Sequence, residues 1–281
     1  MLPRPKDRHD QFDSYMAKWI YNCPQPRVHL LAALPDQSLQ NVQSLSGDAA
    51  HEHGYVAANE TDALAQYHEQ LDQFDNQLVH MTKLVNDAMI QATNAILDAD
   101  LVLAESVIAG DEEIDAVAHD LEEQALELVA LQAPVATELR VLLSGLRISA
   151  SLERMGDLAV HVAKAARLRY PASAVPAELR GVITEMGEVA ERIVQRTGDV
   201  LAERDLLAAG ELGIIDDEMD SLHRQLFRAV LSDDWKYGVE AAIDVTLVSR
   251  YYERFADHAV TIGKRVIHIV TGEPYSTAGV E

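Results

Sequence analysis

The chain has 281 residues, enough for one large helical domain or two smaller domains with cores of their own. Only 5 % of the residues are aromatic, and Ala, Leu, Val, Glu and Asp dominate, which favours helical bundles over sheets. Because 23 Lys and Arg face 46 Asp and Glu, the net charge is -23, which argues against nucleic acid or an anionic membrane surface as the main partner.

The cellular compartment follows from two further features of the sequence. The single cysteine, Cys23, has no partner for an internal disulfide, which fits a reducing cytosol. No apolar run approaches the ~20 residues that span a bilayer, and the first residues do not resemble a secretion signal. We therefore expect a cytoplasmic protein without membrane insertion.

Residues 1–66 differ in character from the rest of the chain. They are rich in proline and in polar runs, and no helical or strand period is sustained. We expect a disordered N-terminal extension, in which the apolar patch Leu30–Leu34 forms at most one helical turn or a docking segment. A further hypothesis places the natural start of the protein near Val56.

From Tyr67 onward, apolar residues recur in steps of three and four, which predicts three helices in a first unit over residues 67–169. The first of these helices begins near Tyr67. Asp100 is expected to cap the second helix, which stops before Pro134. The third runs from about Val135 to Leu168.

The proline-containing segment Tyr170–Pro176 cannot continue a helix and therefore divides the chain into two similar halves. The second unit, residues 177–272, repeats the three-helix order. Its helices are expected from about Ala177 to Glu203, from Asp205 to Leu231 and from Lys236 to Val270. Gly272 can terminate the last helix. Glycines within the helices, among them Gly187 and Gly198, are expected to let helices approach closely rather than to bind a ligand.

The two halves share sequence as well as helix order. The segment Leu152–Lys164 recurs without a gap as Tyr252–Lys264, and Asp111–Leu121 aligns with Asp216–Leu226. This is an internal duplication. We therefore predict an all-α fold of two tandem antiparallel three-helix bundles, each of which buries its own apolar stripes.

Each half carries one acidic pair on its middle helix and another on its last helix. The pairs are Asp111 with Asp115 and Glu153 with Asp157 in the first half, and Asp216 with Asp220 and Glu253 with Asp257 in the second. Carboxylates at i and i+4 share one helix face and repel each other by about 0.2–0.5 kcal/mol per pair. Their repetition indicates a bound cation, although a solvated helix face in a very acidic protein is the simpler alternative for any single pair.

The donor chemistry limits the choice of metal. Carboxylate oxygens suit iron(III), Mn²⁺, Mg²⁺ or Ca²⁺ rather than a closed thiolate zinc site. His161 follows Asp157 by one turn and His119 follows Asp115, but we expect both histidines to be ordinary surface residues.

Arginine is also part of the repeated segment. Arg154 and Arg254 follow the signature glutamates directly, so they point roughly 100° away from them around the helix axis. We expect both to pair with a neighbouring helix, and an anion site is the alternative.

Taken together, these features resemble the PhoU family of bacterial phosphate-signalling regulators. The resemblance rests on the helix order, the two Glu-x-x-x-Asp signatures, the Asp-rich openings of the preceding helices and the Gly-Glu-Pro-Tyr sequence at 272–275. It covers about Tyr67–Ser276. One such signature is unspecific, because any amphipathic helix can hold two acids four residues apart, whereas two copies at matched positions are fairly specific.

The resemblance implies a non-enzymatic negative regulator that links the ATPase of the high-affinity phosphate ABC transporter to a membrane sensor histidine kinase. It also implies that the signature carboxylates bind multinuclear metal clusters of iron, manganese, magnesium or zinc. The residues assigned in this way are Glu153, Asp157, Glu253 and Asp257, and the repeat alignment adds Asp111, Asp115, Asp216 and Asp220 as further ligands. A homodimer is the expected assembly.

Two other classes of protein remain as alternatives. A ferritin-like di-metal enzyme needs Glu-x-x-His on two helices, and no Glu of this chain is followed three residues later by His. A metal-free helical scaffold is the second alternative. The sequence contains no P-loop, nucleophile elbow or Rossmann fingerprint, so we expect no enzymatic activity.

Overall fold

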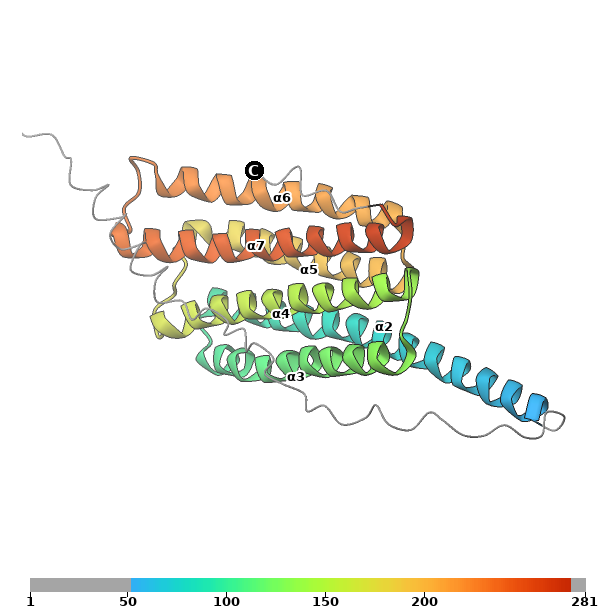
Figure 1. The fold of residues 1–281 in the computed structure, drawn as a ribbon. Helices are drawn as coiled ribbons and strands as arrows, with labels where there is room; N and C mark the ends of the chain where they lie inside the picture. Colours follow the sequence, from blue (N-terminus) through green and yellow to red (C-terminus); the bar gives the residue numbers. More distant parts are fainter. Residues whose placement is uncertain (1–51, 274–281) are drawn as a thin grey trace, which may run out of the picture. The chain divides into compact units, whose positions relative to one another are not determined.

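A computed structural model describes residues 52–273, and this part of the chain forms six α-helices in two sets of three (Figure 1). The first set is α2 (Glu52–Asp98), α3 (Leu101–Gln132) and α4 (Thr137–Arg169). The second is α5 (Arg180–Glu203), α6 (Leu206–Val230) and α7 (Gly238–Thr271), preceded by the short 3-10 helix η1 (Ala177–Leu179). The predicted all-helical fold with a repeated three-helix order is confirmed. Among these helices, none has both the length and the apolar composition needed to cross a bilayer.

The first helix starts earlier than the sequence indicated. We expected it to begin near Tyr67, but α2 begins at Glu52, so that expectation is wrong. The added stretch is rich in Ala and Glu, which favour helix even where no apolar stripe repeats. The rest of the expected extension, residues 1–51 with Cys23 and Leu30–Leu34, lies outside the described residues.

Several helix ends lie where the sequence placed them. The Asp100 side chain accepts a hydrogen bond from the backbone N–H of Leu103 at 3.0 Å, and Asp205 accepts one from Leu207 at 2.8 Å. Both aspartates therefore satisfy an N–H group that a helix start leaves without a partner. At the other end, Gly272 terminates α7 with a φ of 73°, a left-handed conformation that glycine adopts without strain.

The first helices of the two halves pack against each other through small residues. A Cβ atom on Gly187 of α5 would lie 2.6 Å from Thr93 Cγ2 of α2, and one on Gly198 would lie 3.1 Å from Thr82 Oγ1. Because the higher-numbered threonine meets the lower-numbered glycine, α2 and α5 run antiparallel. The predicted role of these glycines, close approach of helices, is confirmed.

Two partly exposed ion pairs connect α2 of the first half with the two ends of α5 in the second half. Arg204 pairs with Asp75, and Arg180 Nη2 lies 3.1 Å from Asp98 Oδ1. These pairs lie at opposite ends of the α2–α5 contact. The last helices, α4 and α7, also pack along each other.

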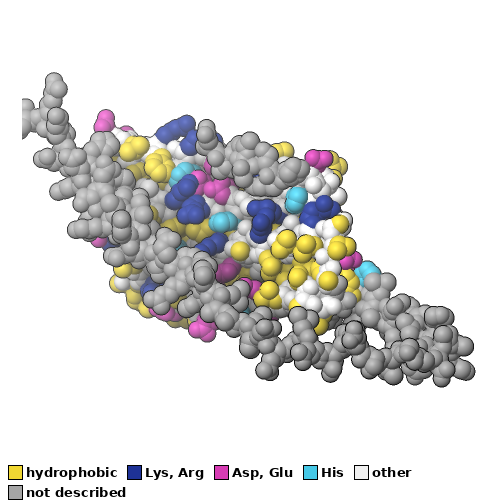
Figure 2. Space-filling model, in the orientation of Figure 1, with side chains coloured by type: hydrophobic (Ala, Val, Ile, Leu, Met, Phe, Trp, Pro, Cys, Tyr) yellow, Lys and Arg dark blue, Asp and Glu magenta, His cyan; other side chains and the backbone are white. Residues whose placement is uncertain are grey.

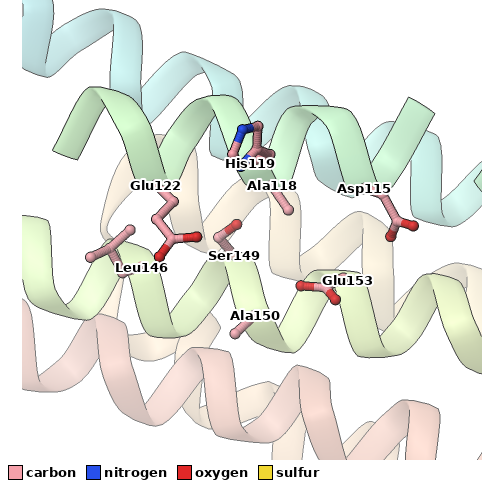
Figure 3. A pocket seen from close by; sticks show the side chains of 8 residues that line it. All are labelled: Asp115, Ala118, His119, Glu122, Leu146, Ser149, Ala150 and Glu153. Atoms are coloured by element: carbon pink, nitrogen blue, oxygen red, sulfur yellow. The ribbon is translucent and has the colours of Figure 1, made fainter. Parts of the chain in front are cut away.

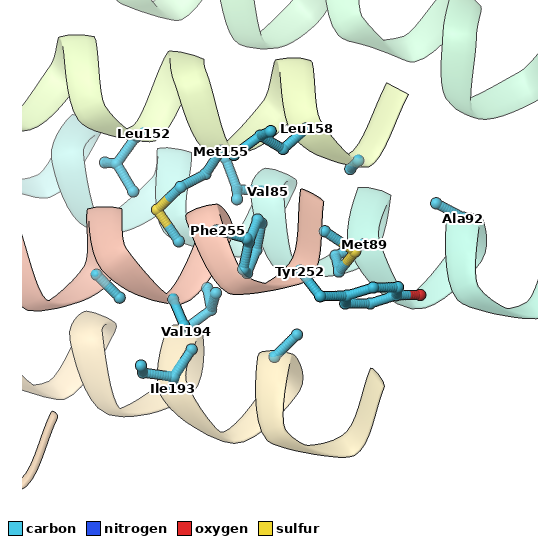
Figure 4. Close-up of a cluster of buried hydrophobic side chains, with 14 of the residues drawn as sticks. Val85, Met89, Ala92, Leu152, Met155, Leu158, Ile193, Val194, Tyr252 and Phe255 are labelled. Carbon is cyan, nitrogen blue, oxygen red and sulfur yellow. The ribbon is translucent and has the colours of Figure 1, made fainter. Parts of the chain in front are cut away.

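The hydrophobic core is shared by both halves. Figure 4 shows Val85 and Met89 of α2, Leu152 and Met155 of α4, Ile193 and Val194 of α5, and Tyr252 and Phe255 of α7 in one buried cluster. The fully buried Tyr252 hydroxyl lies 2.7 Å from Thr93 Oγ1, which ties α7 to α2. The sequence predicted that each bundle buries its own stripes, and the structure adds that the two bundles bury part of those stripes against each other.

Candidate functional site

The first acidic cluster consists of Asp111 and Asp115 on α3 with Glu153 and Asp157 on α4. The two helices pack side by side, and Gly156 lets them approach closely. A Cβ atom at Gly156 would lie 3.3 Å from Asp111 Oδ1. The four acids that the sequence assigned to this half therefore lie on two helices in close contact.

The acids of this cluster act on one another electrostatically. Burial raises the pKa of Asp111 to about 6, and the neighbouring charges of Asp115, Asp157 and Glu153 contribute to this rise while Lys164 opposes it. Burial and then the charge of Asp157 raise the pKa of Asp115. Burial and then Asp115 raise the pKa of Glu153. These mutual effects cross the α3–α4 contact, so the carboxylates share one electrostatic site.

The second acidic cluster repeats this arrangement with Asp216 and Asp220 on α6 and Glu253 and Asp257 on α7. Burial raises the pKa of Asp216 to about 7, and the charges of Asp257 and Asp220 add to the effect. The pKa values of Glu253 and Asp257 are also raised by burial, although Arg250 lowers both.

The second acidic cluster contains two oxygen atoms that fit a hard cation. Asp216 Oδ1 and Glu253 Oε2 are buried and have no hydrogen-bond partner in the described residues. A buried carboxylate oxygen without a partner is costly unless something positive compensates it, and Mg²⁺, Mn²⁺ and iron take such oxygens as ligands. Over the described range, however, no three His, Cys, Asp or Glu side chains are arranged to hold a metal ion. The metal sites therefore stay a prediction.

One arginine near the clusters has a partner different from the one expected. Arg154 Nη1 lies 2.9 Å from Asp157 Oδ2 on the same helix, so the prediction that it pairs with a neighbouring helix is wrong. Residues three apart on a helix are close enough for a long arginine side chain to reach the carboxylate. Arg254 lies near Asp257, and its charge partly opposes the rise that burial causes in the pKa of that carboxyl.

The two histidines beside the first cluster contact other groups. His161 Nδ1 lies 2.6 Å from the backbone oxygen of Asp157, and its ring packs on Tyr251 with 5.1 Å between centroids. His119 Nε2 lies 3.4 Å from Glu123, and its side chain is 68% exposed. These contacts favour the expected role of both as ordinary surface residues.

A pocket of about 390 Å³ adjoins the first acidic cluster between α3 and α4 (Figure 3). Its lining residues are Asp115, Ala118, His119 and Glu122 on α3 and Leu146, Ser149, Ala150 and Glu153 on α4. Acidic side chains form part of the wall, and small or apolar side chains form the rest. We define this as the α3–α4 pocket.

Two side chains that the sequence did not single out, Arg250 and His223, occupy the corresponding place in the second half. Arg250 is hydrogen-bonded to Glu253, and His223 Nδ1 lies 2.9 Å from Ser249 Oγ. The repeat alignment contained a signal for both, because it pairs Arg250 with Ala150 and His223 with Ala118.

The surface near the pocket is apolar. Figure 2 shows hydrophobic side chains gathered over the end of α3 and the start of α4, with Lys and Arg side chains farther along the same face. The exposed large hydrophobic residues at that end are Leu126, Val129, Leu131, Val135 and Leu143. The pocket therefore opens beside an apolar surface.

Comparisons with known proteins agree with this architecture. The family model of the PhoU domain matches residues 78–166 and again residues 183–266. The phosphate-specific transport system accessory protein PhoU homolog 2 of Mycobacterium tuberculosis is 48% identical over 206 residues, which are 73% of this chain and 97% of that protein. The PhoU homolog of Aquifex aeolicus is 33% identical over 207 residues, 73% of this chain and 92% of that protein.

Solved structures show the same fold. The crystal structure of PhoU from Pseudomonas aeruginosa superposes with a TM-score of 0.67 at 26% identity, and the match covers 74% of this chain and all of that one (100%). The phosphate transport system regulatory protein PhoU from Streptococcus pneumoniae superposes with a TM-score of 0.67 at 23% identity, over 74% of this chain and 98% of that one.

The family assignment settles the question of catalysis. The relatives that match are described as accessory proteins of phosphate-specific transport, so the prediction of a non-enzymatic protein is confirmed. The duplicated sequence, the paired acidic clusters and the similarity over both halves lead to one conclusion: this chain belongs to the PhoU family.

Proposed function

We propose that this chain is a cytoplasmic negative regulator of phosphate uptake and phosphate-starvation signalling. It links the ATPase of the phosphate ABC transporter to a sensor histidine kinase and keeps the starvation response off when phosphate is plentiful. The names of the relatives support this role, because they describe accessory and regulatory proteins of phosphate-specific transport.

The proposal includes metal ions on the two acidic clusters. Ligands would come from Asp111, Asp115, Glu153 and Asp157 in the first half and from Asp216, Asp220, Glu253 and Asp257 in the second. The observation that supports this best is the pair of buried oxygens without hydrogen-bond partners in the described residues, Asp216 Oδ1 and Glu253 Oε2. The ions would be divalent or trivalent: iron, manganese, magnesium or zinc.

The role of the metal in this proposal is structural. Each cluster joins the middle helix of one half to its last helix, so a bound cation would cancel the repulsion across that contact. The relative position of the two helices, and with it the surface offered to the ATPase or the kinase, would then depend on occupancy. We propose a homodimer as the working assembly.

A pull-down experiment tests the metal-dependent adaptor. The wild-type chain, purified without chelators, is compared with a variant in which Glu153, Asp157, Glu253 and Asp257 are replaced by Gln or Asn. We expect the wild type to retain the transporter ATPase and the kinase and the variant to lose most of that binding. Equal binding by both proteins removes the metal from the mechanism and favours the metal-free scaffold.

Complementation in a deletion strain tests the regulatory role itself. The wild-type chain is expected to restore repression of the phosphate-starvation response at high phosphate. Failure to restore it, with normal expression of the protein, contradicts the proposed function. Elemental analysis and native mass spectrometry of the same preparation measure the metal content and the oligomeric state.

A further inference from the structure

The two halves of the molecule treat the repeated signature glutamate differently. In the second half, Arg250 donates a hydrogen bond to Glu253, whose side chain is only 14% exposed. In the first half, the repeat places Ala150 at the position of Arg250 and Glu153 at the position of Glu253. The first half therefore keeps the carboxylate and has a methyl group where the second half has its guanidinium.

A second pair of positions differs in the same direction. His223 lies against Ser249 in the second half, with 2.9 Å between Nδ1 and Oγ. The first half keeps the serine as Ser149 but has Ala118 in place of the histidine. Ala118 and Ser149 both line the α3–α4 pocket, so the volume that an imidazole fills in one half is open in the other.

A third position changes an aromatic side chain into a charged one. Phe227 packs edge-on against His223, with 4.7 Å between the ring centroids. The repeat pairs Phe227 with Glu122, which lines the α3–α4 pocket. The first two differences remove side-chain volume and positive charge from the first half, and the third adds a carboxylate to the wall of its pocket.

The surroundings of the pocket match the chemistry of a basic side chain. Three carboxylates, those of Asp115, Glu122 and Glu153, line it together with Leu146 and Ala150. An arginine or lysine has an apolar stem and a charged head, so it satisfies both kinds of wall. Beyond the pocket, Leu126 lies one turn after Glu122 and is 62% exposed. Apolar residues that flank the arginine or lysine in a partner could pack on this exposed leucine.

We propose that the α3–α4 pocket receives a basic side chain, preferably arginine, from an apolar segment of a partner protein. This side chain pairs with Glu122 and with Glu153, as Arg250 pairs with Glu253 in the second half. The guanidinium and a metal ion on the first acidic cluster therefore exclude each other at Glu153. The inference rests on the proposed adaptor function and names the chemistry by which a partner is recognised.

A matched pair of peptides tests the proposal on the full chain. The probes are acetyl-Leu-Ala-Arg-Ala-Leu-amide and the same peptide with citrulline, which has nearly the shape of arginine but no charge. We expect the arginine peptide to bind the wild type about tenfold more tightly, because citrulline keeps N–H donors but lacks the positive charge that strengthens a hydrogen bond to a carboxylate. NMR titration followed at the methyl groups of Ala118, Leu146 and Ala150 measures the affinity and locates the binding.

Substitutions that copy the second half complete the test. Ala150→Arg supplies the missing guanidinium internally and is expected to abolish the preference for the arginine peptide. Glu122→Gln is expected to reduce the preference several-fold. Arg250→Ala frees Glu253 in the other half, where His223 and Phe227 still fill the space, and is expected to leave the affinity measured at Ala118, Leu146 and Ala150 unchanged. Ala150 is exposed on a helix, so its replacement leaves the core intact, which circular dichroism verifies.

The outcomes separate this inference from the proposed function. Equal binding of the two peptides, no binding of either, or a preference that survives Ala150→Arg overturns the inference. If Ala150→Arg also captures the ATPase and kinase as well as the wild type does, the adaptor role stands without this pocket. If the wild type captures neither protein, the proposed function fails, whatever the peptides show.

Discussion

Asp216 shows how a single residue can be tuned by its neighbours. Burial is the largest cause of its raised pKa of about 7, and the charges of Asp257 and Asp220 come next. One of its oxygens is buried without a hydrogen-bond partner among the residues that the structure describes. A nearby positive charge would therefore stabilise the ionised Asp216 carboxylate. Without such a charge, ionisation of Asp216 destabilises the folded state.

This destabilisation predicts a pH dependence. An ordinary Asp in the unfolded chain loses its proton near about pH 4, whereas folded Asp216 retains it until about pH 7. The folded state therefore binds more protons between these values, and stability falls as the pH rises through that window. We expect the metal-free chain to be more stable at about pH 5 than at about pH 8.

Asp216→Asn checks the origin of the effect, because asparagine resembles the protonated acid. It is expected to raise the free energy of unfolding at about pH 8 by on the order of 1 kcal/mol, after allowance for solvent screening, and to flatten the pH dependence. Urea unfolding with a chelator present measures both. Asp233→Asn in the exposed turn before α7 is the control, and an equal effect there contradicts the explanation.

At the scale of helices, the sequence predicts most ends and faces because these depend on local chemistry. Asp100 and Asp205 cap helices since their side chains accept bonds from nearby N–H groups. The start of α2 could not be predicted in this way, because helix propensity continues there after the apolar stripe ends. The partner of Arg154 was missed for a different reason: angular position alone does not describe the reach of a flexible side chain.

The contact between α2 and α5 makes a prediction about glycine. Gly187→Ala would place Cβ 2.6 Å from Thr93 Cγ2, and Thr93 is fixed by hydrogen bonds to the Met89 oxygen and the Tyr252 hydroxyl. We expect this overpacking to reduce the free energy of unfolding by about 1–3 kcal/mol.

The matched control is Gly210→Ala on α6, where no atom lies within 4 Å of the added Cβ. Alanine is the better helix former, so this change is expected to stabilise the protein by up to about 1 kcal/mol. Thermal and urea denaturation of the two variants provides the comparison. A neutral or stabilising Gly187→Ala contradicts the described approach of the two helices.

For the whole molecule, the candidate site was predictable up to a point. Two acids four residues apart lie on one face of any helix. The duplication indicated that the middle and the last helix of each half both carry such a pair. The sequence did not indicate that the halves share a core, because that requires knowing which apolar stripes face each other across α4 and α7. The sequence did not indicate the α3–α4 pocket. The pocket arises because Ala118 and Ala150 have small side chains at the positions where the second half has His223 and Arg250.

Metal binding is expected to appear as a change in global stability. A cation that binds only the folded chain adds about 2.7 kcal/mol at a concentration about 100-fold above its Kd. We expect Mn²⁺ or Mg²⁺ to raise the thermal midpoint at about pH 8, and to do so less in a variant with Asp216→Asn and Glu253→Gln. Differential scanning calorimetry across a metal titration tests this, and equal gains in both proteins would exclude the second cluster as a site.

Arg250 has a consequence for stoichiometry. Two like halves would ordinarily engage two copies of the same ligand. The second half already contains the guanidinium of Arg250, so only the first half can bind an arginine of a partner protein. Each chain then counts as monovalent toward an arginine-bearing partner, and a homodimer would gather two such partners rather than four.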